Sequence, residues 1–221
     1  MKPRLTLFDL DHTLLHGDSD VLWCEFLLEQ CVLDREQFEV RNAQMEAGYQ
    51  AGTVDAAAFA GFYVSTLAGR SPAQWESLRQ RFLAEWIVPR IPRDAMVLVS
   101  EHLAAQELVV MTTATNRFLT ELTAEHFGIA HLLATEPEQR EGIFTGRPTG
   151  TLNMREGKVT RLNAFLAERG LALADHTSAA YSDSINDLPL LQAVDLPVAV
   201  DPDARLHAIA RERGWRVLHL R

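Results

Sequence analysis

Short runs of apolar residues recur along the chain and are bounded by Gly, Pro, Asp or Ser. Most of these runs lack the strict alternation of apolar and polar residues that marks a strand with one face in water. They therefore predict strands that are buried on both faces of a parallel sheet. The runs are Leu5–Leu10, Leu108–Met111, His131–Ala134, Ser178–Tyr181, Leu196–Val200 and Trp215–Leu220.

Helical signals fill the intervals between most of these predicted strands. Arg117–Phe127 and Lys158–Arg169 carry apolar residues at helical spacing, and Asp203–Arg213 is opened by an Asp-Pro pair. A glycine that can end a helix follows each of the three. Strands that alternate with helices predict an α/β fold with a doubly wound parallel sheet.

The region between the first two predicted strands interrupts this rhythm. It contains no strand-like run, and glycines separate its helix-like pieces, Asp20–Leu33, Asp34–Ala51, Thr53–Leu67 and Pro72–Trp86. We predict an all-helical insertion over residues 18–90 and a core built from residues 1–17 and 91–221. A further stretch, Gly142–Lys158, spaces four glycines through polar residues and predicts a hairpin or flap.

Composition and charge narrow the class of protein. The chain has 221 residues, of which 47% are hydrophobic and 23% charged, so it can bury a core without disulfides or metal staples. The formal net charge of −9 argues against binding to nucleic acid or to an anionic membrane. No apolar run is long enough for a signal peptide or a membrane span, so we expect a cytoplasmic location. Cys24 and Cys31 lie seven apart in a predicted helix, and we expect two buried free thiols. The sequence gives no indication of oligomeric state.

Two acidic residues, Asp9 and Asp11, stand at the end of the first predicted strand. Strand geometry places them on one side of the chain, at the edge where open α/β sheets bind their ligands. Two carboxylates at such close range repel each other, so the pair indicates a metal site, a general acid/base pair, or both. A solvated strand end is the alternative that this segment alone leaves open.

A second acidic pair, Asp183 and Asp187, follows the strand predicted at 178–181. Residues four apart face the same point if a helix begins nearby. Short oxygen ligands suit Mg²⁺, which takes few carboxylates and keeps several waters. Capping of the following helix by Asp183 or Ser184 is the alternative.

Hydroxyl groups and a lysine lie between the two acidic pairs. The strand predicted at 108–111 runs into Thr112, Thr113 and Thr115, whose hydroxyls, with nearby backbone N–H groups, can bind an oxyanion. Lys158 stands at the start of a predicted helix, where the helix dipole disfavours a cation. We therefore expect an anionic partner for Lys158, a solvated surface lysine being the alternative.

Taken in order along the chain, these groups resemble the motifs of the haloacid dehalogenase-like (HAD) superfamily of phosphohydrolases. The matching segments are Asp9-Leu-Asp-His-Thr13, Thr113, Lys158 and Asp183-Ser-Ile-Asn-Asp187. A helical insertion after the first motif, together with Ile143–Gly146 ahead of Gly157-Lys158, resembles subfamily IB, which contains phosphoserine phosphatases. The resemblance implies a Rossmann-like core with an inserted helical cap.

The resemblance also implies an activity. It points to a Mg²⁺-dependent phosphomonoesterase that hydrolyses a small phosphorylated metabolite, such as phosphoserine or histidinol phosphate, through an aspartyl-phosphate intermediate. Asp9 would be the nucleophile and Asp11 the general acid and base. The other implied roles are phosphate binding by Thr113, Ala114 and Lys158, and Mg²⁺ binding by Asp9, the backbone carbonyl of Asp11 and Asp183, with Asp187 contributing through water or by orienting the other groups. Thr13 would support the site near Asp11, with a simple turn-stabilising hydroxyl as the alternative, and Asn186 would orient Lys158 or Asp183, with a turn asparagine as the alternative.

The cap is where the match to the family is incomplete. Phosphoserine phosphatases grip the amino and carboxyl groups of their substrate with a Glu and an Arg of the cap, and Asp20, Glu25 and Arg41 are the candidates here. The aromatic residues of the insertion are expected mostly to form the core of the cap, with one or two lining the pocket: Trp23, Phe26, Phe62, Tyr63 and Trp86.

Three alternative functions stay open at this point. They are a phosphotransferase that uses an alcohol as acceptor, a non-catalytic phosphate-binding module, and a dehalogenase. The intact Asp9/Asp11 pair weighs against the binding module, which needs no acid/base. Asp11 and the Asp183/Asp187 pair weigh against the dehalogenase, because displacement of a halide requires neither.

Overall fold

A computed structural model of the chain describes residues 2–50 and 55–220. The strands are β1 (Arg4–Phe8), β2 (Leu108–Asn116), β3 (His131–Arg140), β4 (Ile143–Thr149), β5 (Thr177–Ser182), β6 (Leu196–Val200) and β7 (Arg216–Leu218). The α-helices are α1 (Ser19–Glu29), α2 (Arg35–Gln50), α3 (Ala56–Val64), α4 (Pro72–Phe82), α5 (Arg93–Ala104), α6 (Arg117–His126), α7 (Glu156–Ala167), α8 (Leu188–Ala193) and α9 (Ala204–Arg213).

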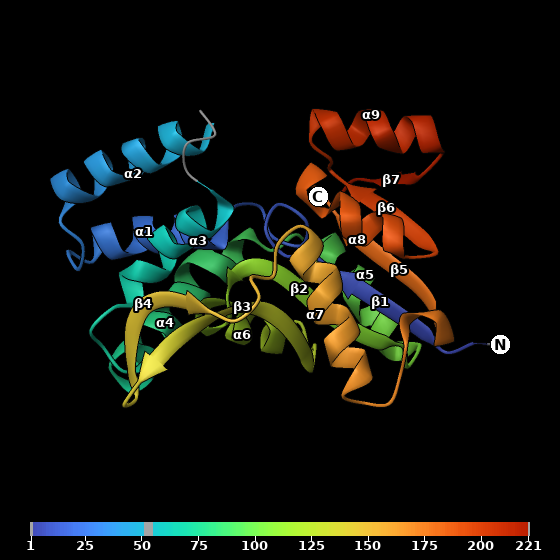
Figure 1. Cartoon of the computed structure of the whole chain (residues 1–221), viewed down its shortest axis with the longest axis horizontal. Helices are drawn as coiled ribbons and strands as arrows, with labels where there is room; N and C mark the ends of the chain where they lie inside the picture. The colour runs from blue at the N-terminus through green and yellow to red at the C-terminus, as the bar shows by residue number, and fades with distance from the viewer. Residues whose placement is uncertain (1, 51–54, 221) are drawn as a thin grey trace.

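The strands form one sheet in the order β4-β3-β2-β1-β5-β6-β7. β1 pairs in parallel with β2 on one side and with β5 on the other. The chain runs outward from β1 through β2 and β3, then crosses back to β5 and runs outward again (Figure 1). The carboxyl end of β1 therefore lies at the switch point where doubly wound sheets bind their ligands, and the predicted fold class is confirmed.

Each face of the sheet has its own apolar core. Leu5 and Leu7 of β1 pack in one cluster with residues of α7, α8 and α9. Phe8 packs in the other cluster with residues of α5 and α6. Because both faces of the central strands are covered by helices, their sequences are almost continuously apolar, which is why the strands could be predicted.

Between β1 and β2 the described residues form helices and turns and no strand. Figure 1 shows α1, α2 and α3 grouped at one end of the molecule, away from α8 and α9. Trp23, Phe26 and Phe62 are buried and Tyr63 is half-buried. Trp23 and Phe26 belong to the same apolar cluster as Phe8 of β1, so they do not form a core of the insertion alone. The predicted helical pieces that end at residue 51 or begin at residue 53 extend outside the described residues. None of the helices described is long and apolar enough to cross a membrane.

The sequence pattern predicts no helix at α5. Its N-cap, Pro92, makes no side-chain capping bond, and its C-cap, Ala105, is not a glycine. Neither end of the helix therefore carries a clear sequence signal.

Two further expectations require correction. The hairpin predicted at 142–158 is formed instead by β3 and β4, which pair antiparallel, and residues 150–155 form a loop. The second half of β3 is polar and half exposed, so its sequence does not indicate a buried strand. The expectation of two buried thiols is wrong for Cys31, which is exposed because α1 ends at Glu29, whereas Cys24 is buried.

Candidate active site

Asp9 stands directly after β1, at the carboxyl end of the sheet. Its backbone N–H donates to the carbonyl oxygen of Tyr181 in β5, which fixes the position of the residue between the central strands. The side chain is 6% exposed and lines a cavity of about 240 Å³. The two carboxylate oxygens have different partners: Oδ1 lies 2.7 Å from Lys158 Nζ, and Oδ2 accepts a hydrogen bond from Thr13.

Lys158, in the first turn of α7, is 2% exposed and is held by two carboxylates. Its ammonium group lies 2.7 Å from Asp9 Oδ1 and 2.6 Å from Asp187 Oδ2. These partners are the anions that the unfavourable helix position led us to expect. Gly157 is required next to it, because a Cβ atom there would collide with the carbonyl oxygen of Leu152.

Thr13 connects the two acidic pairs across 170 residues of sequence. Its hydroxyl donates to Asp9 Oδ2 at 2.9 Å and lies 3.2 Å from Asp183 Oδ1. The same hydroxyl accepts the backbone N–H of Asp183 at 3.0 Å. Thr13 therefore fixes the side chains of Asp9 and Asp183 relative to each other.

The carboxylates of this cavity are poorly compensated. Burial raises the pKa of Asp9 to about 7, although Lys158 acts to lower it. Burial and the charges of Asp9 and Asp187 raise the pKa of Asp183 to about 8. One lysine is too little positive charge for so many buried acids, so a bound cation would stabilise their ionised forms.

Asp11 turns away from Asp9 toward a set of hydroxyl groups. Oδ1 accepts from the backbone N–H and the hydroxyl of Ser19, and Oδ2 accepts from Thr113 at 3.2 Å and Thr115 at 2.8 Å. Burial and the nearby charge of Asp18 nevertheless raise the pKa of Asp11 above its usual value. The hydrogen bonds from Ser19 and Thr115 therefore stabilise the ionised carboxylate of Asp11, while its burial favours the protonated form.

The register of the hydroxyl motif follows from the alternation of β2. Thr113 and Thr115 face Asp11, whereas Thr112 lies on the other face and accepts from Asn153 Nδ2 at 2.9 Å. Thr113 is fully buried, while Ala114 is exposed and lines the cavity. The Thr113 hydroxyl is engaged with Asp11, so at this point of the chain Ala114 is the residue that faces the substrate space.

The geometry does not gather the four predicted metal ligands into one cluster. Within the described ranges, no group of three or more His, Cys, Asp or Glu side chains is placed to hold a metal ion. The Asp187 carboxylate binds Lys158 and the Ser182 hydroxyl, at 2.6 and 2.7 Å. Asp9 and Asp183 remain as two oxygen donors joined by Thr13, a set that fits Mg²⁺ because this ion takes one or two carboxylates together with water and phosphate oxygens.

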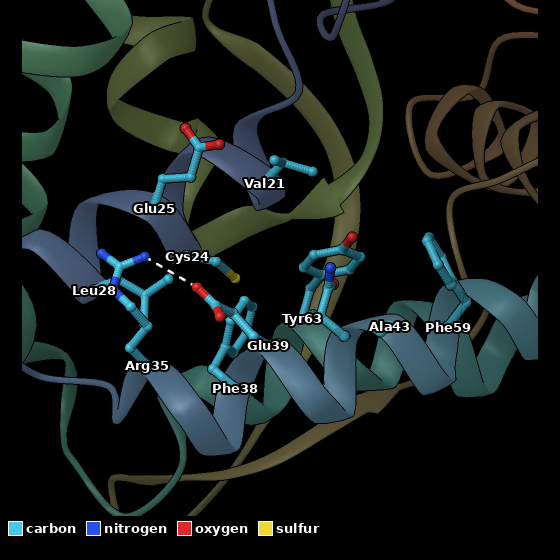
Figure 2. Close-up of a pocket in the computed structure, with 11 residues that line it drawn as sticks. Val21, Cys24, Glu25, Leu28, Arg35, Phe38, Glu39, Ala43, Phe59 and Tyr63 are labelled. Carbon is cyan, nitrogen blue, oxygen red and sulfur yellow. Dashed lines mark hydrogen bonds and ion pairs between the residues drawn. The ribbon is translucent and has the colours of Figure 1, made fainter.

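The remaining predicted residues differ in their distance from the site. Asp20 and Asn186 line the catalytic cavity, although the side chain of Asn186 makes no hydrogen bond to Lys158 or Asp183. Burial, reinforced by the charges of Asp18 and Asp11, raises the pKa of Asp20 well above its usual value. Glu25 lines a neighbouring cavity (Figure 2). Arg41 lines neither of these two cavities and stacks over the ring of Phe62, at 5.6 Å from its centroid.

Sequence reasoning missed two groups that hold the acids in place. Ser19 donates to Asp11, and Ser182 donates to Asp187. Each stands next to an aspartate, Asp18 or Asp183, at the end of a strand or the start of a helix. A hydroxyl in such a position is a signal that could have been used, since serine there commonly bonds to neighbouring groups.

Comparison with known proteins places this geometry in context. Residues 6–192 match the family of haloacid dehalogenase-like hydrolases. The chain is 39% identical to a histidinol-phosphatase of Neisseria meningitidis serogroup C over 220 residues, 99% of either chain. It is 34% identical to a phosphoserine phosphatase of Mycobacterium tuberculosis over 217 residues, which covers 97% of this chain and 70% of that protein.

Solved structures share the fold. A Bordetella pertussis Tohama I protein described as having unknown function is 44% identical, covers 99% of both chains and superposes with a TM-score of 0.95. A phosphoserine phosphatase with a phospho-aspartyl intermediate analogue superposes with a TM-score of 0.68 at 18% identity, over 99% of this chain and 94% of that one.

Proposed function

Because the chain belongs to the haloacid dehalogenase-like hydrolase family, we propose that Asp9 is the nucleophile of a phosphatase that hydrolyses small phosphomonoesters with Mg²⁺. The observation that carries this assignment is the position of Asp9. It lies at the switch point of the sheet, lines the cavity, and is held between Lys158 and Thr13. A carboxylate so fixed is oriented before the substrate binds, which is what an in-line displacement requires.

In the first step, Asp9 attacks phosphorus and the bond to the leaving alkoxide breaks. Asp11 gives its proton to that alkoxide, and the raised pKa of its buried carboxyl keeps the proton available. In the second step, Asp11 takes a proton from the water that attacks the aspartyl-phosphate. Asp11 can act in both steps because they need opposite protonation states.

Lys158 and the carboxyl-terminal part of β2 would bind the phosphoryl oxygens. The ammonium group of Lys158 lies 2.7 Å from Asp9 Oδ1, so it would stand beside the oxygens of a phosphoryl group bound to Asp9. Backbone N–H groups around the exposed Ala114 would add hydrogen bonds to the phosphate. The Thr113 hydroxyl would donate a hydrogen bond to the carboxylate of Asp11 instead of binding the phosphate.

Asp9, Asp183 and the backbone carbonyl of Asp11 would hold Mg²⁺. When bound, the ion supplies positive charge that lowers the repulsion between the carboxylates and a phosphate dianion. Asp187 would hold Lys158 in place and would not bind the metal, since its carboxylate is already shared between Lys158 and Ser182. Of the two roles that the family resemblance implies for Asp187, this is the orienting one.

Residues 18–90 would form the cap that selects the leaving group, and residues 1–17 and 91–221 the catalytic core. Histidinol phosphate and phosphoserine are the two candidate substrates that the names of the relatives suggest. Water would be the acceptor of the phosphoryl group. A cytoplasmic location is part of the same proposal.

Phosphate release from 4-nitrophenyl phosphate tests the assignment. Wild-type protein should hydrolyse this ester with Mg²⁺ and lose the activity when the metal is chelated. Asp9→Asn should be inactive although it unfolds at a similar temperature. Activity that persists in the Asp9→Asn variant, or that does not depend on a divalent metal, would overturn the proposal.

A further inference from the structure

A second cavity, of about 690 Å³, lies among α1, α2 and α3 (Figure 2). It shares lining residues with the catalytic cavity. Each helix turns one stripe of residues toward this second cavity. From α1 these residues are Val21, Cys24, Glu25 and Leu28, whose spacing of three and four places them on one face. Phe59 and Tyr63 of α3 line both cavities, so the two spaces meet at these rings.

This cap cavity carries a net negative charge, which comes from Glu25. Of the three charged residues that line it, Arg35 and Glu39 pair with each other at 3.2 Å, as the dashed line in Figure 2 shows. Glu25 forms no ion pair or hydrogen bond with any residue of the ranges 2–50 and 55–220. Asp18 adds negative charge on the neighbouring wall of the catalytic cavity. This field attracts a cation and repels a carboxylate.

The other walls of the cap cavity are apolar and partly aromatic. Leu28, Phe38, Phe59 and Tyr63 line it. Aromatic walls favour flat apolar rings, and their faces also attract cations. The volume of 690 Å³ falls within the range of about 300–1,000 Å³ that is common for small-molecule sites.

We propose that this cap cavity binds the distal part of the substrate's alcohol, and that this part carries a flat ring and a cationic nitrogen but no carboxylate. Glu25 pairs with the cationic nitrogen, and Phe38, Phe59 and Tyr63 contact the ring. This inference rests on the proposed function and extends it by naming the leaving group. Phosphoserine has no ring and carries a carboxylate, so it fits this cavity poorly.

Two esters, one with a cationic amine and one in which that amine is acetylated and uncharged, test the role of Glu25. They are the phosphate ester of a 2-amino-3-arylpropan-1-ol and its N-acetyl derivative, assayed on the full chain with Mg²⁺. We expect wild-type kcat/KM to favour the amine. Glu25→Gln should lower this amine preference about threefold to fivefold, the effect of one partly exposed ion pair. Glu29→Gln is the matched control, because Glu29 is exposed on the same helix and does not line the cavity. It should leave the preference unchanged.

The ring is tested by a smaller ester, 2-aminoethyl phosphate. Wild-type protein should prefer the aryl amine ester, and Phe38→Ala should reduce that preference by about threefold to tenfold, the range expected when one aromatic contact is lost.

The outcomes separate the two proposals. If wild-type protein fails to hydrolyse 4-nitrophenyl phosphate, the proposed function is wrong. If it hydrolyses that ester but prefers phosphoserine to the aryl amine ester, the inference about the leaving group is wrong and the function stands. Equal effects of Glu25→Gln and Glu29→Gln would also contradict the inference.

Discussion

Replacement of Lys158 by methionine should destabilise the fold as well as stop catalysis. The side chain is buried between two carboxylates, at 2.7 Å from Asp9 and 2.6 Å from Asp187. At these distances each pair has a Coulomb energy of about 6 kcal/mol at an effective dielectric constant near 20. Much of this energy is offset by the cost of burying the charges. Removal of one partner from a buried ion pair generally costs about 3–5 kcal/mol, because the other charge stays buried without compensation.

The expected loss is large enough to measure directly. Urea unfolding at pH 8 without divalent metal should show a free energy of unfolding lower by about 3–5 kcal/mol. The corresponding fall in melting temperature is about 6–20 °C for a chain of this size. Asp187→Asn in the Lys158→Met background should recover about 2 kcal/mol, because it removes one of the uncompensated carboxylates.

The size of the effect should depend on pH in a defined direction. Burial already raises the pKa of Asp9 to about 7 while Lys158 lowers it, so loss of the lysine raises that pKa further. A carboxyl with a raised folded-state pKa stabilises the fold when protonated, and this contribution is lost as the pH rises through the folded-state pKa. The difference between wild type and Lys158→Met should therefore be larger at pH 8 than at pH 5. A difference below about 1 kcal/mol at pH 8, or one independent of pH, would refute the reasoning.

Four other changes probe separate parts of the structure. Thr13→Ala should raise the Mg²⁺ concentration for half-maximal activity about 10- to 100-fold, because the hydroxyl that orients both proposed metal ligands is lost; unchanged metal dependence would remove Thr13 from this role. Asp11→Asn should reduce kcat on an alkyl phosphate about 10²- to 10⁴-fold and reduce it less on 4-nitrophenyl phosphate, whose leaving group needs no proton. Asn153→Ala should lower the free energy of unfolding by about 2 kcal/mol, since its buried Nδ2 lies within hydrogen-bond distance of three acceptors on β2 and β3; a loss below about 0.5 kcal/mol would show that these bonds are replaced. Burial acts to raise the pKa of Glu136, but hydrogen bonds from Arg117 and Arg161 hold it below its usual value. Its contribution is present at neutral pH and is lost as the pH falls through that lowered pKa, so the melting temperatures of wild type and Glu136→Gln should converge in acid.

The positions of the catalytic groups along the chain could be predicted because they depend on the backbone alone. Asp9, Thr113 and Asp183 each follow an apolar run, and the ends of neighbouring parallel strands meet at one edge of the sheet. The anionic partner of Lys158 was predictable for an equally simple reason, its unfavourable place at a helix start.

The directions of the side chains could not be predicted in the same way. Asp183 and Asp187 were expected to face one point if a helix began nearby, but Asp187 lies at the end of a 3₁₀ turn, and its carboxylate is directed to Lys158. Thr13 was expected near Asp11, but its hydroxyl connects Asp9 and Asp183. Such contacts join residues far apart in sequence, and each depends on how two loops pack together.

The helices after β1 show the same limit on a larger scale. Arg41 was a candidate for substrate binding, yet Arg35 of the same helix lines the cap cavity and Arg41 lies against Phe62. The periodicity of a helix identifies its faces, but it does not say which face meets a cavity. That choice depends on how α2 docks on its neighbours.

The most direct test of the central claim is to trap the phosphorylated enzyme. Wild-type protein is mixed with excess phosphomonoester and Mg²⁺, quenched in acid within the first turnover and reduced with borohydride, which converts phosphoaspartate to homoserine. Mass analysis of the peptides should place this change at Asp9 and nowhere else. Active protein that carries no modification, or carries it at another aspartate, would contradict the assignment of Asp9 as the nucleophile.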